Sequence, residues 1–545
     1  MVQRSDLEAP APTRRMTTFG LVDGLDHTAT SGTYAWLGVP YAQPPVGPLR
    51  WQAPVDPLPW TGVRTATRFG QACAQAGRYF SPAPDGAPYG LAVREGFGKP
   101  VGSEDCLTLN IWRPAHDRPQ LPVIVFIHGG SAISGYSADP VYDGQALARK
   151  ADAVVVTMNY RVGALGWLDL PQLKTGEADS DSGNFGLLDQ LQALRFVQGS
   201  IAAFGGDPGN VTVMGQSAGA ANVWALMMSP RSAGLMHKAV PLSGGIANAS
   251  RAVARKYSAA LLQAMVVADG KAADADAARA WIEARSDAQV ASYVRGWSSD
   301  QLLSVIIANP QLGNSPASIE DGDVLPVDSI AALAAGRHRK IPVLAGNTRD
   351  EGTLLAALFG VVTGSGIPGF ALGDYDRFGL QFDFDPDVPT RLTPPDLINA
   401  AYLPVDAKPF GWNASTRILG DRIFGPVVPQ LDSLASHDPT RVWYYRFDWD
   451  ELAAPFDAVY GATHALDLPF IFGNFGENAF SFAFGSANRP GREALSDAMI
   501  ASLSAFARTG DPNTPGLGLA WPNWPATLVL DATPTQLRLA IQDAT

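Results

Sequence analysis

A serine lies at the centre of a short run of small residues, Gly215-Gln216-Ser217-Ala218-Gly219, that could supply a nucleophile. A β-branched strand pattern at residues 211–214 precedes it, and an alanine-rich, helix-forming run begins at residue 220. Small residues at this spacing let a strand and a helix approach closely around a serine with strained backbone angles. The hydroxyl then lies at a helix N-terminus, where developing negative charge is stabilised. The pattern therefore favours Ser217 as a catalytic nucleophile over an incidental serine in a strand-to-helix turn.

The residues around this serine resemble a known family signature. Residues 204–219, from an aromatic-Gly-Gly run to Gly-x-Ser-Ala-Gly, and residues 104–114 match two signatures of the type-B carboxylesterase/lipase family, which includes cholinesterases and fungal lipases. The chain resembles a bacterial-type carboxylesterase of this family over about residues 17–530. The resemblance implies an α/β-hydrolase fold, in which helices flank a central, mostly parallel twisted sheet and large helical and loop insertions form a cap. It also implies hydrolysis of carboxylic esters without a cofactor.

A serine nucleophile needs a base within hydrogen-bond reach and a carboxylate that orients the base. In α/β-hydrolases the acid and then the histidine follow the serine along the chain. Three of the seven histidines precede Ser217, and His237 follows it with no acid-bearing loop between them. His338 and His437 lie in polar turns, whereas His464 lies in a glycine-containing loop after a late strand pattern, in a context that matches the family. We expect His464 to be the base.

Two adjacent carboxylates, Asp350 and Glu351, follow a short strand pattern at the right place for the acid. Adjacent side chains point apart, so only one of them can reach His464. The sequence alone leaves both possibilities open. The family resemblance implies that Glu351 is the acid and that Asp350 is a structural partner, for example of Arg349.

A glycine-rich loop, residues 128–135, follows the apolar run at residues 122–127. Backbone N–H groups of such a loop can point into a site because no Cβ blocks them. The resemblance implies that the N–H groups of Gly130, Ser131 and Ala218 form an oxyanion hole. Many relatives have a third glycine at the position of Ser131, but a backbone donor requires only a small residue there.

The resemblance also bears on two residues next to the triad. Ser243 stands where the family has a second serine near the triad, and a plain strand-end hydroxyl explains it equally well. Gln216 stands where cholinesterases carry a glutamate, and residues 74–105, where cholinesterases place a choline-binding tryptophan, contain none. We therefore expect small to medium neutral or anionic esters as substrates in preference to choline esters.

The chain contains two cysteines, Cys73 and Cys106, on either side of a loop rich in proline, glycine and aromatic residues. Two buried thiols are the plain alternative, whereas the resemblance implies a disulfide that closes this loop over the active site. A disulfide favours an exported protein, periplasmic or secreted, whose leader has been removed. Residues 1–16 lack the apolar core of a secretory signal, so a cytoplasmic protein is the other possibility.

Composition narrows the function classes further. The 545 residues are 46% hydrophobic and 17% charged, with a net charge of −12, which describes a globular protein with ample core. The acidic balance and the lack of a Lys/Arg run argue against a nucleic-acid partner. No apolar run approaches the length of a membrane span, and no Cys/His spacing indicates a metal. We expect a small-molecule ester as the partner, no metal, no cofactor, and a monomer or dimer.

The resemblance implies one catalytic domain over residues 17–545, after a flexible N-terminal segment, residues 1–16. Strands are predicted near residues 107–111, 122–127, 153–158, 211–214, 238–244, 341–345 and 442–447. Helices are predicted near residues 187–197 and 495–507. Three cap-like insertions are expected: residues 246–336, alanine-rich and helical, and residues 74–105 and 356–440, with little periodicity.

Two other functions are compatible with the sequence. The same triad could act on amide, carbamate or thioester bonds, because it serves acyl transfer generally. A non-catalytic adhesion or binding relative of the fold is disfavoured, since Ser217, Glu351 and His464 are all present.

Overall fold

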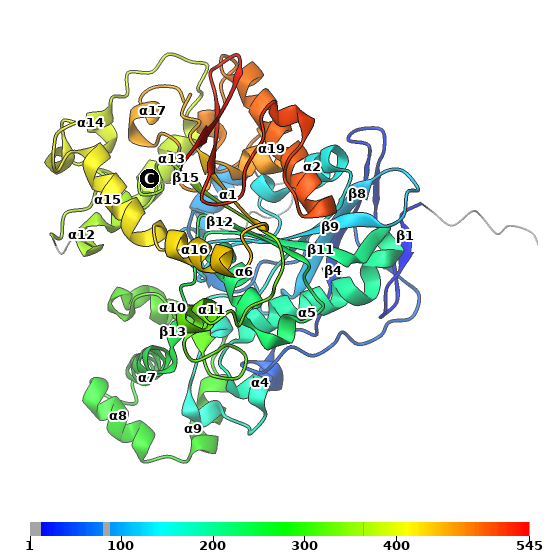
Figure 1. The fold of residues 1–545 in the computed structure, drawn as a ribbon. Helices are drawn as coiled ribbons and strands as arrows, with labels where there is room; N and C mark the ends of the chain where they lie inside the picture. The colour runs from blue at the N-terminus through cyan, green and yellow to red at the C-terminus, as the bar shows by residue number, and fades with distance from the viewer. Residues whose placement is uncertain (1–11, 80–87, 363–364, 544–545) are drawn as a thin grey trace, which may run out of the picture.

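The centre of the protein is an 11-stranded sheet, seen in a computed structural model that describes residues 12–79, 88–362 and 365–543 (Figure 1). Its strand order is β18-β17-β16-β15-β12-β11-β9-β10-β8-β4-β3. The strands of this sheet are β3 (Leu25–His27), β4 (Thr33–Pro40), β8 (Thr108–Pro114), β9 (Leu121–Ile127), β10 (Val154–Met158), β11 (Gly206–Gln216), β12 (Lys238–Leu242), β15 (Val343–Thr348), β16 (Val442–Phe447), β17 (Thr527–Ala532) and β18 (Leu537–Gln542).

Neighbouring strands from β10 to β17 are all parallel, and antiparallel pairs occur only towards the two edges. The carboxyl ends of the parallel strands therefore meet along one edge of the sheet. The predicted α/β-hydrolase architecture, with a mostly parallel central sheet, is confirmed. The smaller strands outside this sheet are β1 (Arg14–Met16), β2 (Leu21–Asp23), β5 (Val63–Thr65), β6 (Gln75–Ala76), β7 (Pro100–Val101), β13 (Ala249–Ser250) and β14 (Ile319–Glu320).

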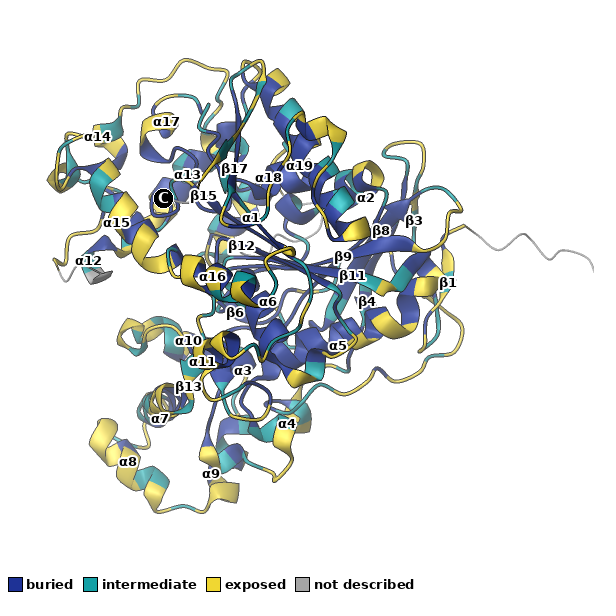
Figure 2. Cartoon of the chain, in the orientation of Figure 1, coloured by how far each residue is buried: buried dark blue, intermediate teal, exposed yellow. Residues whose placement is uncertain are grey.

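The apolar strands are buried on both faces, as their continuous hydrophobic runs predict (Figure 2). Side chains of β9 alternate between two cores: Ile124 and Phe126 face one, while Val123 and Val125 face the other. Figure 1 shows α2 and α19 over one face of the sheet and α5 and α6 over the opposite face. Each fully buried aliphatic side chain contributes about 1.5–3 kcal/mol, so this sandwich rigidly positions the strand ends.

The helices form the two covering layers and the cap. They are α1 (Tyr89–Gly96), α2 (Gln145–Ala151), α3 (Gly163–Gly166), α4 (Ala178–Asp181), α5 (Phe185–Ser200), α6 (Ala218–Met228), α7 (Arg251–Ala268), α8 (Ala275–Glu283), α9 (Asp287–Arg295), α10 (Ser299–Ala308), α11 (Ser329–Ala334), α12 (Phe359–Val362), α13 (Asp374–Asp383), α14 (Pro394–Leu397), α15 (Trp412–Phe424), α16 (Val427–His437), α17 (Phe456–Val459), α18 (Leu468–Phe472) and α19 (Arg489–Thr509). Within the described ranges, no helix is both long and apolar enough to cross a membrane.

The insertion at residues 246–336 is helical, as expected. Serine side chains cap three of its helices: Ser250 accepts from the backbone N–H of Val253, and Ser286 and Ser298 form capping boxes at the starts of α9 and α10. Such caps satisfy backbone donors that the helix itself leaves free. In Figure 1, α7, α8 and α9 form a lobe below the sheet.

The other two insertions contain helices that the sequence did not predict. Residues 356–440 include α13, α15 and α16, and residues 74–105 include α1. The buried positions of α15 follow helical spacing, but two of them are Thr416 and Gly420, so its apolar periodicity is weak. The strands β17 and β18 were also missed.

The expected boundary of the flexible N-terminal segment at residue 16 is wrong. Residues 1–11 lie outside the described residues, but Arg14–Met16 form β1, which pairs with β2. Short strands of this kind carry too few apolar residues to be recognised from the sequence.

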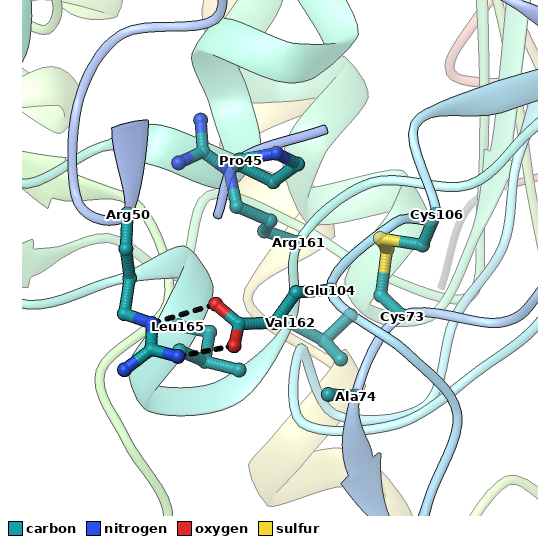
Figure 3. Close-up of a pocket in the computed structure, with 9 residues that line it drawn as sticks. All are labelled: Pro45, Arg50, Cys73, Ala74, Glu104, Cys106, Arg161, Val162 and Leu165. Atoms are coloured by element: carbon teal, nitrogen blue, oxygen red, sulfur yellow. Dashed lines mark hydrogen bonds and ion pairs between the residues drawn. A yellow bond between two sulfur atoms is a disulfide. The ribbon is translucent and has the colours of Figure 1, made fainter. Parts of the chain in front are cut away.

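Cys73 and Cys106 form the expected disulfide, 33 residues apart in sequence. Beside it lies a small cavity of about 10 Å³, room for about one water molecule (Figure 3). Figure 3 shows the guanidinium of Arg50 paired with the carboxylate of Glu104, two residues before Cys106, and both side chains are largely buried. The disulfide and this ion pair hold the end of the 74–105 loop on the core.

Candidate active site

Ser217 lies on a tight turn between β11 and α6, as predicted. Its backbone has φ 59° and ψ −123°, a conformation that is strained for a residue with a side chain. A Cβ on Gly219 would lie 2.1 Å from the carbonyl oxygen of Ile127, and one on Gly215 would lie 2.4 Å from the carbonyl oxygen of Gly219. Only glycine fits at both positions, which is the physical reason for the Gly-x-Ser-x-Gly spacing.

The glycine-rich loop after β9 lies directly against this turn. A Cβ on Gly129 would lie 3.0 Å from the Cβ of Ser217. Gly130 and Ser131 both have positive φ, 98° and 55°. Within the described part of the chain, the backbone N–H groups of Gly130, Ser131 and Ala218 have no hydrogen-bond partner, so they are free to donate to an oxyanion beside Ser217.

A buried histidine supports the same loop. His128 stacks on the ring of Tyr160 at 4.4 Å, and the Tyr160 hydroxyl donates to the His128 carbonyl oxygen at 2.7 Å. Burial lowers the pKa of His128 to about 4, so at neutral pH its neutral ring donates from Nδ1 to the carbonyl oxygen of Gly129 at 2.9 Å. This histidine is a structural part of the loop.

Glu351, and not its neighbour Asp350, contacts the predicted base. One carboxylate oxygen of Glu351 accepts from the backbone N–H of Thr348 at 2.8 Å, and the other is hydrogen-bonded to Nδ1 of His464. Asp350 points the other way and accepts from Arg349 at 2.7 Å and from the backbone N–H of Ala462 at 3.0 Å. Of the two carboxylates that the sequence left open, Glu351 is therefore the one that contacts His464.

His464 is buried between Glu351 and two side chains that the sequence did not link to it. The ring of Phe424, at the end of α15, stacks on the imidazole with a centroid distance of 4.7 Å. The side-chain amide of Gln216 lies 3.1 Å from Nε2 of His464. Among the described residues, no hydrogen bond joins the Ser217 hydroxyl to His464.

Ser243, the other residue expected near the triad, lies at the end of β12 beside the Ser217 turn. Its backbone N–H donates to the carbonyl oxygen of Gly346 at 2.7 Å. Its hydroxyl is buried, and in the described structure it has no hydrogen-bond partner. Ser243 therefore makes no hydrogen bond to Glu351 or His464.

A second buried carboxylate, Asp467, interacts electrostatically with Glu351 and His464. Its Oδ2 accepts from the Tyr445 hydroxyl at 2.6 Å, and its Oδ1 has no partner within the described residues. Burial raises the pKa of Asp467 to about 6, with a further contribution from the negative charge of Glu351, against the opposing effect of the Tyr445 hydrogen bond. The sequence signal for it was only its position shortly after His464.

No group of three or more metal-ligating side chains occurs in residues 12–79, 88–362 and 365–543. The arrangement supports acid–base and nucleophilic chemistry. A carboxylate holds one nitrogen of the imidazole, and the other nitrogen lies against Gln216, the residue before Ser217. The loop with free N–H donors packs against the same turn. Such an arrangement can take a proton from a serine and stabilise an oxyanion.

Comparison with known proteins agrees with this geometry. The model of the carboxylesterase family matches residues 11–543. The chain is 34% identical over 524 residues to the para-nitrobenzyl esterase of Bacillus subtilis, with 95% of this chain and 94% of that protein aligned. It is 33% identical over 515 residues to the fumonisin B1 esterase of Sphingopyxis macrogoltabida, with 94% and 84% aligned.

Solved structures give the same picture. The crystal structure of a Geobacillus stearothermophilus carboxylesterase aligns with a TM-score of 0.73 at 32% identity, over 97% of this chain and 98% of that one. A thermophilic para-nitrobenzyl esterase aligns with a TM-score of 0.73 at 29% identity, over 97% of both chains.

Proposed function

The chain belongs to the carboxylesterase family and is an ester hydrolase, and we propose that it works through an acyl-enzyme on Ser217 with His464 as base and Glu351 as acid. The observation that carries this proposal is the buried contact between Glu351 and Nδ1 of His464, next to the turn that carries Ser217. A carboxylate at Nδ1 fixes the tautomer in which Nε2 carries the lone pair.

The steps follow from that tautomer. Ser217 Oγ attacks the acyl carbon while its proton passes to Nε2 of His464. The carbonyl oxygen becomes an oxyanion, which accepts hydrogen bonds from the N–H groups of Gly130, Ser131 and Ala218. The C–O bond to the alcohol breaks as Nε2 returns the proton to the leaving oxygen. Water then attacks the acyl carbon while Nε2 takes its proton. The bond to Ser217 Oγ breaks as Nε2 returns that proton to the serine, which releases the carboxylic acid product.

Glu351 acts through its negative charge and must be held in a fixed orientation. Imidazolium forms during attack, and the negative charge of Glu351 stabilises it. The backbone N–H of Thr348 orients the carboxylate from the other side.

We propose small to medium neutral or anionic esters as substrates. Gln216 places a neutral amide next to the nucleophile, and residues 74–105 contain no tryptophan, so two features that attract a quaternary ammonium are missing. A cation–π contact alone is worth about 0.5–2 kcal/mol.

The triad is tested by Ser217→Ala and by covalent labelling. The variant should lose about 10³–10⁶-fold in kcat without a change in thermal unfolding. A neutral organophosphate should label Ser217, as mapped by peptide mass spectrometry. Ser258→Ala, at a buried serine of α7 whose hydroxyl donates to Ala254, is the matched control and should keep full activity. Label on another serine, or near-normal activity of Ser217→Ala, would contradict the triad.

The substrate class is tested separately by kcat/KM values. An uncharged butyryl thioester should have a higher kcat/KM than butyrylthiocholine, which has the same acyl chain. An ester should have a higher kcat/KM than its isosteric amide. A clear preference for the choline ester would reject the proposed class while leaving the triad intact.

A further inference from the structure

Gln216 occupies the acceptor that Ser217 needs. Nδ1 of His464 carries the proton shared with Glu351, so Nε2 has a single lone pair. The amide nitrogen of Gln216 lies 3.1 Å from that nitrogen, within hydrogen-bond distance. The hydroxyl of Ser217 has no hydrogen-bond partner in the described part of the chain.

The amide orientation follows from chemistry. An unprotonated Nε2 accepts a hydrogen bond only from the NH₂ end of Gln216, because the carbonyl end would bring two acceptors together. The other end of the amide then lies near Gly129, where a Cβ would be 3.1 Å from Oε1 of Gln216. Gln216 and His464 are both at least 95% buried, so water does not readily replace this contact.

We propose that Gln216 is a positioning residue that holds His464 in a resting orientation, and that the imidazole must leave this amide before it can accept the proton of Ser217. The inference rests on the proposed function of the same site. One lone pair accepts one strong hydrogen bond, so Gln216 and Ser217 compete for it. Once Nε2 is protonated, the amide N–H has no acceptor there, so the contact stabilises the ground state and not the transition state.

An interaction present only in the ground state raises the barrier to attack. Removing it should therefore speed the reaction of Ser217, which is the opposite of what the loss of a supporting contact would do. A neutral hydrogen bond is worth a factor of about two to ten in an equilibrium, and this sets the expected size of the effect.

The test uses Gln216→Met, which keeps the length of the side chain and removes the amide. The measurement is the second-order rate constant for phosphonylation of Ser217 by a neutral organophosphonate, followed from pH 5 to 9. We expect the plateau rate constant to rise about two- to tenfold. The acid limb should move to higher pH by less than one unit, because the lost donor stabilised only the unprotonated ring.

Gln190→Met is the matched control. Gln190 is a fully buried glutamine of α5 whose amide has no hydrogen-bond partner within the described residues, and its replacement should change neither the plateau nor the limb. Gln216→Leu serves as a second variant if Gln216→Met does not fold, as judged by thermal unfolding.

The inference requires both changes together. A plateau that is unchanged or lower, or an acid limb that does not move, overturns it. Such a result would leave the proposed function standing if the wild-type enzyme is phosphonylated at Ser217. Absence of label on wild-type Ser217 would instead reject the proposed function itself.

Discussion

The two sides of the candidate site are held in place by different means. On the nucleophile side, Ser217 and the loop at residues 129–131 are fixed by backbone contacts. The N–H of Ser217 donates to the carbonyl oxygen of Leu242 at 2.8 Å, and Gly219 packs against the backbone of Ile127. On the acid–base side, Glu351 and His464 are held mainly by side chains, including the ring of Phe424 from a distant insertion. The one backbone contact described above is the N–H of Thr348, which donates to Glu351.

The difference teaches where each side is vulnerable. A backbone-held turn tolerates changes in outward side chains, but it does not tolerate a Cβ where two main chains touch. A pair held by side chains is sensitive to side-chain changes instead. An isosteric substitution that alters one proton or one charge removes its function while leaving its packing intact. The predictions below test that contrast from the largest expected effect to the smallest.

An isosteric substitution on the acid–base side should remove most of the activity. Glu351→Gln removes the charge that stabilises the imidazolium and should lower kcat by about 10⁴-fold. Asp350→Asn is the matched control on the adjacent residue, since Asp350 pairs with Arg349 at the surface. It should cost about 1 kcal/mol of stability or less, with kcat nearly unchanged. Steady-state kinetics on both variants, with thermal unfolding alongside, provide the check, and the reverse ranking would mean that Asp350 is the acid.

A single added methyl group on the nucleophile side should lower both stability and activity. Gly219→Ala would place a Cβ 2.1 Å from the carbonyl oxygen of Ile127. We expect the elbow to shift, with a loss of about 3 kcal/mol of stability or more and of most activity. At Gly476 a Cβ meets nothing within 4 Å. The free energy of unfolding of Gly476→Ala should therefore lie within about 0.5 kcal/mol of the wild-type value. Chemical denaturation measures both, and equal midpoints would show that the turn is less constrained than its contacts indicate.

Two buried carboxyl groups should make the stability of the protein depend on pH. Burial raises the pKa of both Asp467, beside the acid–base pair, and Asp139, which accepts from Tyr89, to about 6 from 3.8. A raised native pKa contributes stability below pH 4 that is lost as pH rises through 6. At about 1.4 kcal/mol per pH unit, the loss is up to about 3 kcal/mol for each group.

The variants Asp467→Asn and Asp139→Asn should therefore gain stability relative to wild type between pH 4 and 7, as followed by thermal unfolding at each pH. Only Asp467→Asn should also change the pH–kcat profile, because Asp467 interacts electrostatically with Glu351 and His464. An altered profile for Asp139→Asn would show that the effect does not depend on the electrostatic interaction with Glu351 and His464.

Local rules were enough to predict much of the fold. Strands with continuous apolar runs, such as β9 and β10, were predicted nearly to their ends, because burial on both faces demands such runs. The helices α13 and α15 were not predicted, since glycine, threonine and charged residues interrupt their apolar spacing. Their helical state is stabilised by packing against the rest of the protein.

The same division applies to the site. The Gly-x-Ser-x-Gly spacing was enough to predict the turn at Ser217, because the close contact between Gly215 and the carbonyl oxygen of Gly219 lies within the motif. The contact of Gly219 with Ile127 forms only in the folded sheet. Family resemblance pointed to Glu351, but adjacent carboxylates are equivalent to any local rule. Only the tertiary structure decided that Glu351 contacts His464 while Asp350 accepts from the N–H of Ala462. It also decided that Phe424 covers His464 and that the amide of Gln216 lies on Nε2. These contacts join residues from separate strand ends and an insertion, and their distances are set by how the sheet and the cap pack together.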